Sequence, residues 1–277
     1  MKGADTSDGQ AWATVEYLNP FASDAALRHS NATDWDDGKV VNAARQAPVD
    51  RTTRQIHLQF REKILSDKHS CIGAKAAFRR GSYRLGVYGA IAQREVTEGL
   101  CYDLDEYFRF RDSERARFRD QYVTFAAIFT HDTSSSEREC HDSLWRQLQL
   151  IHHADRRHYG WDPRVESDVK SQEFSYSLGG CAFFIVGMNR YSSRISRRFD
   201  ESALVFNPGP QFELLRTLGK HDSVKAAIRR NEFRLQGSIN PTLADFGEGN
   251  VALTYSGLNV RDISACPFRF RPSLEIE

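Results

Sequence analysis

The sequence contains none of the motifs that mark the common nucleotide-dependent, zinc-dependent or serine-dependent enzymes. It has no GxxxxGK[ST] phosphate loop, no GxGxxG fingerprint, no HExxH pair and no GxSxG elbow. Its five cysteines, at positions 71, 101, 140, 181 and 266, form neither a CxxC pair nor another ligand-like spacing. An odd number of scattered cysteines, with no apolar signal segment at the N-terminus, favours a reduced protein of the cytoplasm.

Neither sign of charge dominates the chain. The 38 lysines and arginines against 37 aspartates and glutamates give a net charge of +1, which argues against a dedicated nucleic-acid binder. No apolar run reaches the length of a membrane span, so no membrane partner is expected. With 277 residues, of which 40% are hydrophobic and 12% aromatic, the chain is predicted to be globular. The aromatic residues suit a core or a flat apolar cofactor pocket.

Hydrophobic patterning separates a weakly periodic N-terminal part from the rest. Residues 1–50 are polar and are predicted to be a flexible or loosely attached extension of a domain spanning 51–277. Apolar or alternating runs predict strands at 83–88, 123–129, 174–178 and 181–187, and helical spacing predicts helices at 94–119 and 137–155. Gly179-Gly180 predicts a hairpin turn. The expected fold is a single mixed α/β (α+β) domain, with a mixed or antiparallel sheet flanked by helices.

The segment HSCIGAKAAFRRGSYRLGVYG, residues 69–89, concentrates reactive groups. Cys71 precedes a predicted helical turn, whose free N–H groups would lower the pKa of its thiol. Gly73 lacks a Cβ, so the backbone there could approach a flat ligand closely. The alternative is that Cys71 is a small, inert, buried residue.

The predicted helix that follows Ser136 carries a second candidate pair. His152 and Asp155 lie one turn apart, so the carboxylate could orient the imidazole. The alternative is a histidine of the core or its boundary.

Three arginines gather in the segment SSRISRRF, residues 192–199. A helix behind a serine N-cap would place Arg194, Arg197 and Arg198 on one cationic face. Guanidinium groups this close repel one another unless an anion neutralises them, and they bind carboxylates or phosphates bidentately. The alternative is a solvated or salt-bridged surface helix.

Several blocks together resemble the YqcI/YcgG family, collinearly over roughly residues 56–268. They are CIGAKAAF with Gly81-x-Tyr83-Arg84, the helical segment 144–155, the phenylalanine-rich hairpin, SSRxxRRF and the C-terminal block. Characterised members of that family are heme proteins that oxidise nitrogen on amino-acid substrates, notably the guanidino nitrogen of arginine. The family pattern has a histidine after Asn207-Pro208, where this chain has Gly209.

The resemblance implies a heme-dependent monooxygenase that hydroxylates an amino or guanidino nitrogen of a small amino-acid-like substrate, with an arginine-like one favoured. Heme b would bind with Cys71 as thiolate ligand to iron, or with His152 as the alternative; Cys71, His152 and Asp155 are the expected catalytic residues. Further cofactor contacts are expected from Gly73, Lys75, Arg84, Arg194, Arg197 and Arg198, and substrate contacts from Asn207, Gln211, Glu213 and Asp245.

No flavin or nicotinamide motif is present, so the electrons would come from a separate reductase, or the oxidant would be peroxide. Two other functions remain open. One is a non-catalytic heme carrier or sensor, and the other is a cofactor-free enzyme or binding protein with an anion site at the arginine segment. The sequence does not determine the oligomeric state.

Overall fold

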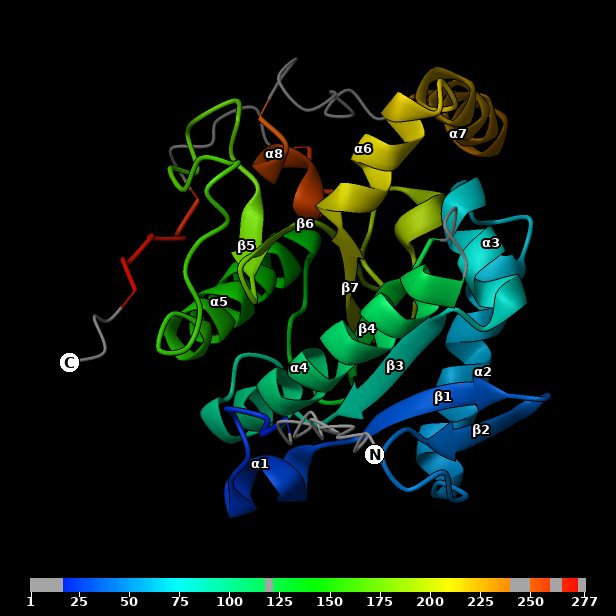
Figure 1. Cartoon of the computed structure of the whole chain (residues 1–277). Helices are drawn as coiled ribbons and strands as arrows, with labels where there is room; N and C mark the ends of the chain where they lie inside the picture. The colour runs from blue at the N-terminus through cyan, green and yellow to red at the C-terminus, as the bar shows by residue number, and fades with distance from the viewer. Residues whose placement is uncertain (1–16, 118–121, 240–249, 260–265, 274–277) are drawn as a thin grey trace, which may run out of the picture.

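The computed structural model describes residues 17–117, 122–239, 250–259 and 266–273 (Figure 1). Its centre is a seven-stranded sheet with the order β2-β1-β3-β4-β7-β6-β5. The strands are β1 (Ala32–Asp36), β2 (Lys39–Asn42), β3 (Tyr83–Tyr88), β4 (Thr124–Phe129), β5 (Tyr176–Leu178), β6 (Cys181–Met188) and β7 (Ser202–Pro208). Strands β3 and β4 are parallel and every other neighbouring pair is antiparallel, so the mixed α/β fold and the β5–β6 hairpin are confirmed.

Several of the helices begin or end at residues that cap them. They are α1 (Asp24–His29), α2 (Arg51–Leu65), α3 (Ile72–Arg80), α4 (Arg94–Arg117), α5 (Glu137–Asp155), α6 (Gly209–Thr217), α7 (His221–Gln236) and α8 (Ala252–Tyr255), with one 3₁₀ turn, η1 (Ile195–Arg197). Ser136 caps α5 by accepting the Glu139 N–H at 3.2 Å. Gly81 ends α3 at φ 75°, a left-handed conformation that suits glycine. No helix in the described part of the chain is both long and apolar enough to cross a membrane.

The N-terminal part differs from its prediction as a loosely attached extension. From residue 17 to residue 50 it is built into the domain, because β1 pairs with β3 and α1 packs on α4. The buried carboxylate of Asp103 on α4 accepts hydrogen bonds from the Ser30 hydroxyl (2.6 Å) and the Asn31 N–H (2.8 Å). Polar contacts of this kind leave no periodic hydrophobic signal in the sequence. Residues 1–16 lie outside the described part of the chain.

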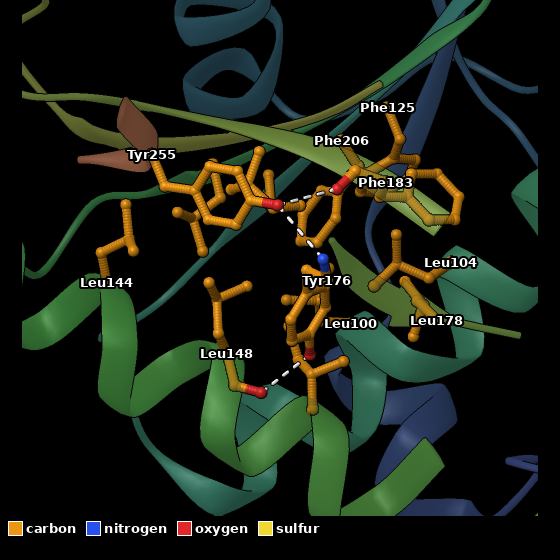
Figure 2. Packing of buried hydrophobic residues seen from close by; sticks show 14 of the residues in the cluster. Leu100, Leu104, Phe125, Leu144, Leu148, Tyr176, Leu178, Phe183, Phe206 and Tyr255 are labelled. Atoms are coloured by element: carbon orange, nitrogen blue, oxygen red, sulfur yellow. Dashed lines mark hydrogen bonds between the residues drawn. The ribbon is translucent and has the colours of Figure 1, made fainter. Parts of the chain in front are cut away.

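One face of the sheet packs against α4 and α5 in a closed aromatic core. In Figure 1, α4 crosses the front of the sheet, while α2 lies behind it. Figure 2 shows how two tyrosines of this core satisfy their hydroxyl groups. Tyr176 donates to the Leu148 carbonyl at 2.8 Å, and Tyr255 donates to the Phe183 carbonyl at 3.2 Å. Paired hydroxyls remove the cost of burying these polar atoms, so this face can be densely filled.

The opposite face is covered in two parts. Over β3 and β4, helices α2 and α3 pack with Phe60 and Phe78, and the Phe78 ring stacks on Tyr83 at 3.8 Å. Over β6 and β7, the cover consists of η1, α6 and α7, with α7 in contact with α3. The strand pleat divides β6 between the two faces: Phe183 and Ile185 enter the closed core, whereas Ala182 and Val186 face the second cover. A cavity lies under this second cover.

Candidate functional site

The cavity has a volume of about 340 Å³ and is bounded by α3, η1, α6, α7 and one face of β6 and β7. Its size falls in the range of small-molecule and cofactor sites, roughly 300–1,000 Å³. Much of its wall is apolar, formed by Ala74, Ala77, Phe184, Val186, Phe212, Leu215, Val224 and Ile228. The polar groups among these walls determine which ligand the cavity suits.

Cys71 borders the cavity and is the N-cap of α3. Its Sγ accepts the Ala74 N–H at 3.4 Å. Burial raises the pKa of the Cys71 thiol, and the N–H groups of Ala74 and Gly73 offset this only in part. The expected lowering of this pKa by the helix terminus is therefore wrong, because desolvation of the thiolate outweighs the helix N–H groups. The thiol is protonated at neutral pH.

Gly73 allows a close approach, as its missing Cβ suggested, but the approaching group is a side chain of the protein. A Cβ at this position would lie 2.9 Å from the Tyr122 ring. Tyr122 therefore packs directly on the first turn of α3 and forms part of the cavity wall beside Cys71.

The arginine segment is not the predicted helix. Backbone hydrogen bonds join Asn189 to Arg197 (3.1 Å) and to Phe199 (3.2 Å), and they hold the chain in a tight loop that has room for only the 3₁₀ turn η1. The expected single cationic face is absent as a result. Arg194 and Arg197 are each only 8% exposed and border the cavity, whereas Arg198 is exposed and donates to the Ser192 carbonyl.

Glu232 of α7 neutralises Arg194. Its Oε2 accepts from Arg194 Nη2 at 2.9 Å, and its Oε1 accepts from the hydroxyls of Ser70 and Ser196. Burial opposes the ionisation of this carboxyl, but the hydrogen bonds from Ser196, Ser70 and Arg194 hold the pKa of Glu232 below its usual value. This network ties α7 to η1 and to the segment that leads into α3.

Arg197 has no such carboxylate partner among the described residues. Its Nη1 donates to the Tyr255 carbonyl at 2.9 Å, and the Gly187 carbonyl lies 3.5 Å away. Burial lowers the pKa of Arg197 to about 10, so the side chain is still a cation at neutral pH. Buried charges are ordinarily paired, and an anion in the cavity would complete this site.

The charge of the cavity lining points in the same direction. Among the described residues that border the cavity, six are arginines or lysines and two are glutamates: Arg164, Arg194, Arg197, Arg216, Lys225 and Arg229, and Glu213 and Glu232. Arg164 is already paired with Asp162 at 2.7 Å and Arg194 with Glu232, so the cationic excess rests on the other four side chains. A cleft lined by one sign of charge concentrates ligands of the opposite sign. The cavity therefore favours a ligand that carries carboxylate or phosphate groups.

His69 also borders the cavity, and sequence reasoning did not single it out. Its Nδ1 lies 3.0 Å from the Ser196 carbonyl, which can only accept, so Nδ1 carries the proton. Burial lowers the pKa of His69 to about 4, so the ring is neutral and Nε2 holds a lone pair. Nε2 is buried and has no hydrogen-bond partner. The sequence did contain one signal for His69, its position two residues before Cys71. Alternate residues of an extended chain point to the same side, so His69 could have been expected near Cys71.

Three of the predicted substrate residues border the cavity, yet two of them are engaged elsewhere. Asn207 accepts from the Thr124 hydroxyl (3.1 Å), and Gln211 accepts from the Val123 N–H (3.1 Å), so both hold the start of β4. Glu213 is half-exposed at the rim, 3.8 Å from Arg164. Asp245 lies outside the described residues.

Two predicted cofactor residues lie away from the cavity. Arg84 on β3 pairs with Asp34 at 2.9 Å and lies over the Phe110 ring at 4.7 Å, which joins β1, β3 and α4. Lys75 is on α3 but is not part of the cavity lining. Arg84 therefore has a structural role, and the electrostatic effect of Lys75 on Cys71 is a minor one.

His152 and Asp155 lie on the other side of the sheet, in the closed core. His152 Nε2 accepts the Arg271 N–H at 3.0 Å, and its ring packs edge-on against Trp161. Asp155 Oδ1 accepts the Gly179 N–H at 2.9 Å, so it secures the β5–β6 turn and does not orient His152 as expected. Burial raises the pKa of Asp155 to about 7. This pair has the character of buried structural residues.

The fold and the cavity define a class: a mixed α/β protein with a largely apolar, cation-lined ligand site between its sheet and helices α3, α6 and α7. Residues 60–269 match the model of the YqcI/YcgG family, and the chain belongs to that family. No curated protein and no solved structure matches the chain significantly.

Proposed function

We propose that the protein is a heme-dependent monooxygenase that hydroxylates an amino or guanidino nitrogen of a small amino-acid-like substrate, with an arginine-like one favoured. The observation that carries the proposal is the cavity. One continuous space brings a candidate iron ligand, Cys71, next to apolar walls and the buried cation Arg197. These three features suit a heme pocket, and they lie within the segment that matches the family model.

The described residues can meet the needs of heme b one by one. The macrocycle needs apolar walls, which Phe184, Val186 and Ile228 offer. The propionates need cations, and Arg197 is the buried cation without a carboxylate partner in the described chain. Iron in heme needs only one protein ligand, so the absence of a group of three His, Cys, Asp or Glu side chains among the described residues does not conflict with the proposal. Bound heme would supply the activated oxygen.

The protein's own part is to bind and orient the substrate. An α-carboxylate suits the exposed Arg216, which borders the cavity, and the half-exposed Glu213 at the rim suits an ammonium or guanidinium group. The apolar walls exclude water from the reacting nitrogen. Electrons come from a separate reductase, or peroxide serves as oxidant.

The test is to purify the protein from cells supplied with a heme precursor and to record its absorption spectrum. The protein is then incubated with L-arginine or L-lysine and a reductant or peroxide, and mass spectrometry looks for products heavier by one oxygen atom. Arg197→Met should weaken heme or substrate binding about 10- to 150-fold, since a hydrogen bond to a charged group contributes roughly 1.5–3 kcal/mol. Arg198→Met is the matched control, because Arg198 is the exposed neighbour of Arg197 and its replacement should leave binding unchanged. A colourless protein at full heme supply would contradict the proposal.

Two other functions are distinguished by the same experiment. A heme carrier or sensor would show the spectrum but no oxidised product. A cofactor-free anion-binding protein is favoured by one observation, the excess of cations in the cavity lining. It would stay colourless and bind inorganic phosphate or a small carboxylate in calorimetry.

We also place the protein in the cytoplasm. All five cysteines are free thiols, which suits a reducing compartment. Fractionation of the native host would test this.

A further inference from the structure

The unsatisfied nitrogen of His69 calls for an explanation. The side chain is 7% exposed, and its Nε2 has no hydrogen-bond partner. A buried polar atom left without a partner costs roughly 1–3 kcal/mol, and such atoms are rare in native proteins. Because His69 borders the cavity, a ligand in that cavity can supply the missing partner.

The state of the ring determines what kind of partner this is. Nδ1–H donates to the Ser196 carbonyl, so Nε2 is a lone-pair donor and not a hydrogen donor. Histidines that bind metals ordinarily have this arrangement, in which the second ring nitrogen donates to a carbonyl that fixes the tautomer and the orientation. Ser196 is itself held by its hydroxyl, which donates to Glu232. The ring is therefore preorganised to bind an electron-pair acceptor.

Cys71 is less prepared for the same role. Its Sγ is engaged as the N-cap of α3, and it must lose a proton before it can bind iron. His69 and Cys71 are two residues apart and border the same cavity, so they cannot reach opposite sides of a macrocycle. Only one of them can be the ligand.

We infer that His69, through Nε2, is the axial ligand to heme iron, and that Cys71 is not. The inference rests on the proposed function and replaces its thiolate with an imidazole. It also differs from the sequence-based alternative, His152, whose Nε2 is occupied by the Arg271 N–H.

The experiment compares the spectra of heme-loaded variants, oxidised and then reduced under carbon monoxide. The wild-type protein should give an unshifted, histidine-type carbonyl Soret band, and Cys71→Ser should keep it. His69→Asn should lose this ligation, while its amide can still donate to the Ser196 carbonyl and so preserve the fold. His69→Gly should regain the histidine-type ferric spectrum when imidazole is added. Circular dichroism of each variant reports whether the fold is intact.

His221→Ala is the matched control, since His221 also borders the cavity and its Nδ1 lies 3.3 Å from the exposed Asp222 carboxylate. It should keep the wild-type spectrum. A strongly red-shifted carbonyl band that disappears in Cys71→Ser would overturn the inference while leaving the proposed function intact. So would a histidine-type band that survives in His69→Asn or disappears in His221→Ala. Wild-type protein with no Soret band at full heme supply would overturn both.

Discussion

Two buried histidines, one on each side of the sheet, differ in what their ring nitrogens contact. His152 lies in the closed core, where the Arg271 N–H occupies its Nε2. His69 lies beside the cavity, where its Nε2 has no partner. Both are neutral, because burial lowers the pKa of each to about 4. The comparison teaches that residue type and burial do not separate a structural histidine from a candidate ligand, whereas its contacts do.

The two sides of the sheet differ in the same way as the two histidines. The α4–α5 side is filled, and the hydroxyls of Tyr176 and Tyr255 within it are paired (Figure 2). The side under η1, α6 and α7 contains the cavity and a buried cation without a carboxylate partner among the described residues. The first side should therefore govern stability and the second should govern binding.

The largest difference in the free energy of unfolding is expected when an aliphatic side chain is truncated to alanine on each side of the sheet. Leu148→Ala in the closed core should lower the free energy of unfolding by about 2–5 kcal/mol, since the surrounding core cannot collapse into the space. Val224→Ala, at the partly exposed cavity wall, should cost less than about 1 kcal/mol, because that side chain already borders open space. Urea denaturation of both variants measures the difference. Equal losses would show that the two sides are equally packed.

The next effect concerns the pH dependence of stability. Burial raises the pKa of Asp155 to about 7, so the folded state retains this proton where the unfolded state loses it. The contribution of Asp155 to stability should therefore fall as the pH rises from about 4 to about 7, and comparison with a variant that cannot titrate isolates this contribution from those of the buried histidines. Asp155→Asn cannot titrate and can still accept the Gly179 N–H. Its stability relative to the wild type should rise over this range by up to about 4 kcal/mol, at about 1.4 kcal/mol per pKa unit. A constant difference would show that Asp155 is ionised in the folded protein.

A smaller effect is expected from overpacking the cavity wall. Gly73→Ala would bring its Cβ to 2.9 Å from the Tyr122 ring and should cost about 1–3 kcal/mol. Adding Tyr122→Leu should recover much of this loss, since the clashing ring is then gone. Gly89→Ala is the control, because its Cβ would meet Val96 at an ordinary 3.7 Å. Thermal unfolding of the wild type, the two single variants and the double variant gives the coupling energy between residues 73 and 122. If the effects of the two substitutions simply add, the close packing of Tyr122 on α3 is contradicted.

The smallest effect is expected at the N-cap of α3. Cys71→Ala removes the acceptor of the Ala74 N–H and should cost about 0.5–1 kcal/mol. Cys71→Ser keeps an acceptor at this position and should be close to the wild type in stability. Identical stability of the Ala and Ser variants would mean that the sulfur contributes nothing as a cap.

Much of the fold could be predicted, because its signals are local. The alternation at 174–178 and the Gly179-Gly180 turn predicted the β5–β6 hairpin, and Ser136 predicted the start of α5. The integration of residues 17–50 could not be predicted in this way. It depends on strand pairing with β3 and on the buried carboxylate of Asp103, and both contacts span long distances in the sequence.

The candidate site likewise has a part that local sequence signals predicted and a part that depends on long-range contacts. The sequence by itself determined the class of the fold and the start of α3, since short-range periodicity and capping fix these, and its collinear blocks of residues indicated the family. Only the tertiary structure decided which polar side chains meet. It turned Arg194 and Arg197 inward and left Arg198 outside, it separated His152 from the cavity, and it left the Nε2 of His69 without a partner at the cavity wall. The physical reason is that hydrogen-bond partners and burial come from residues far apart in the chain, and those partners decide whether a histidine or an arginine is available to a ligand.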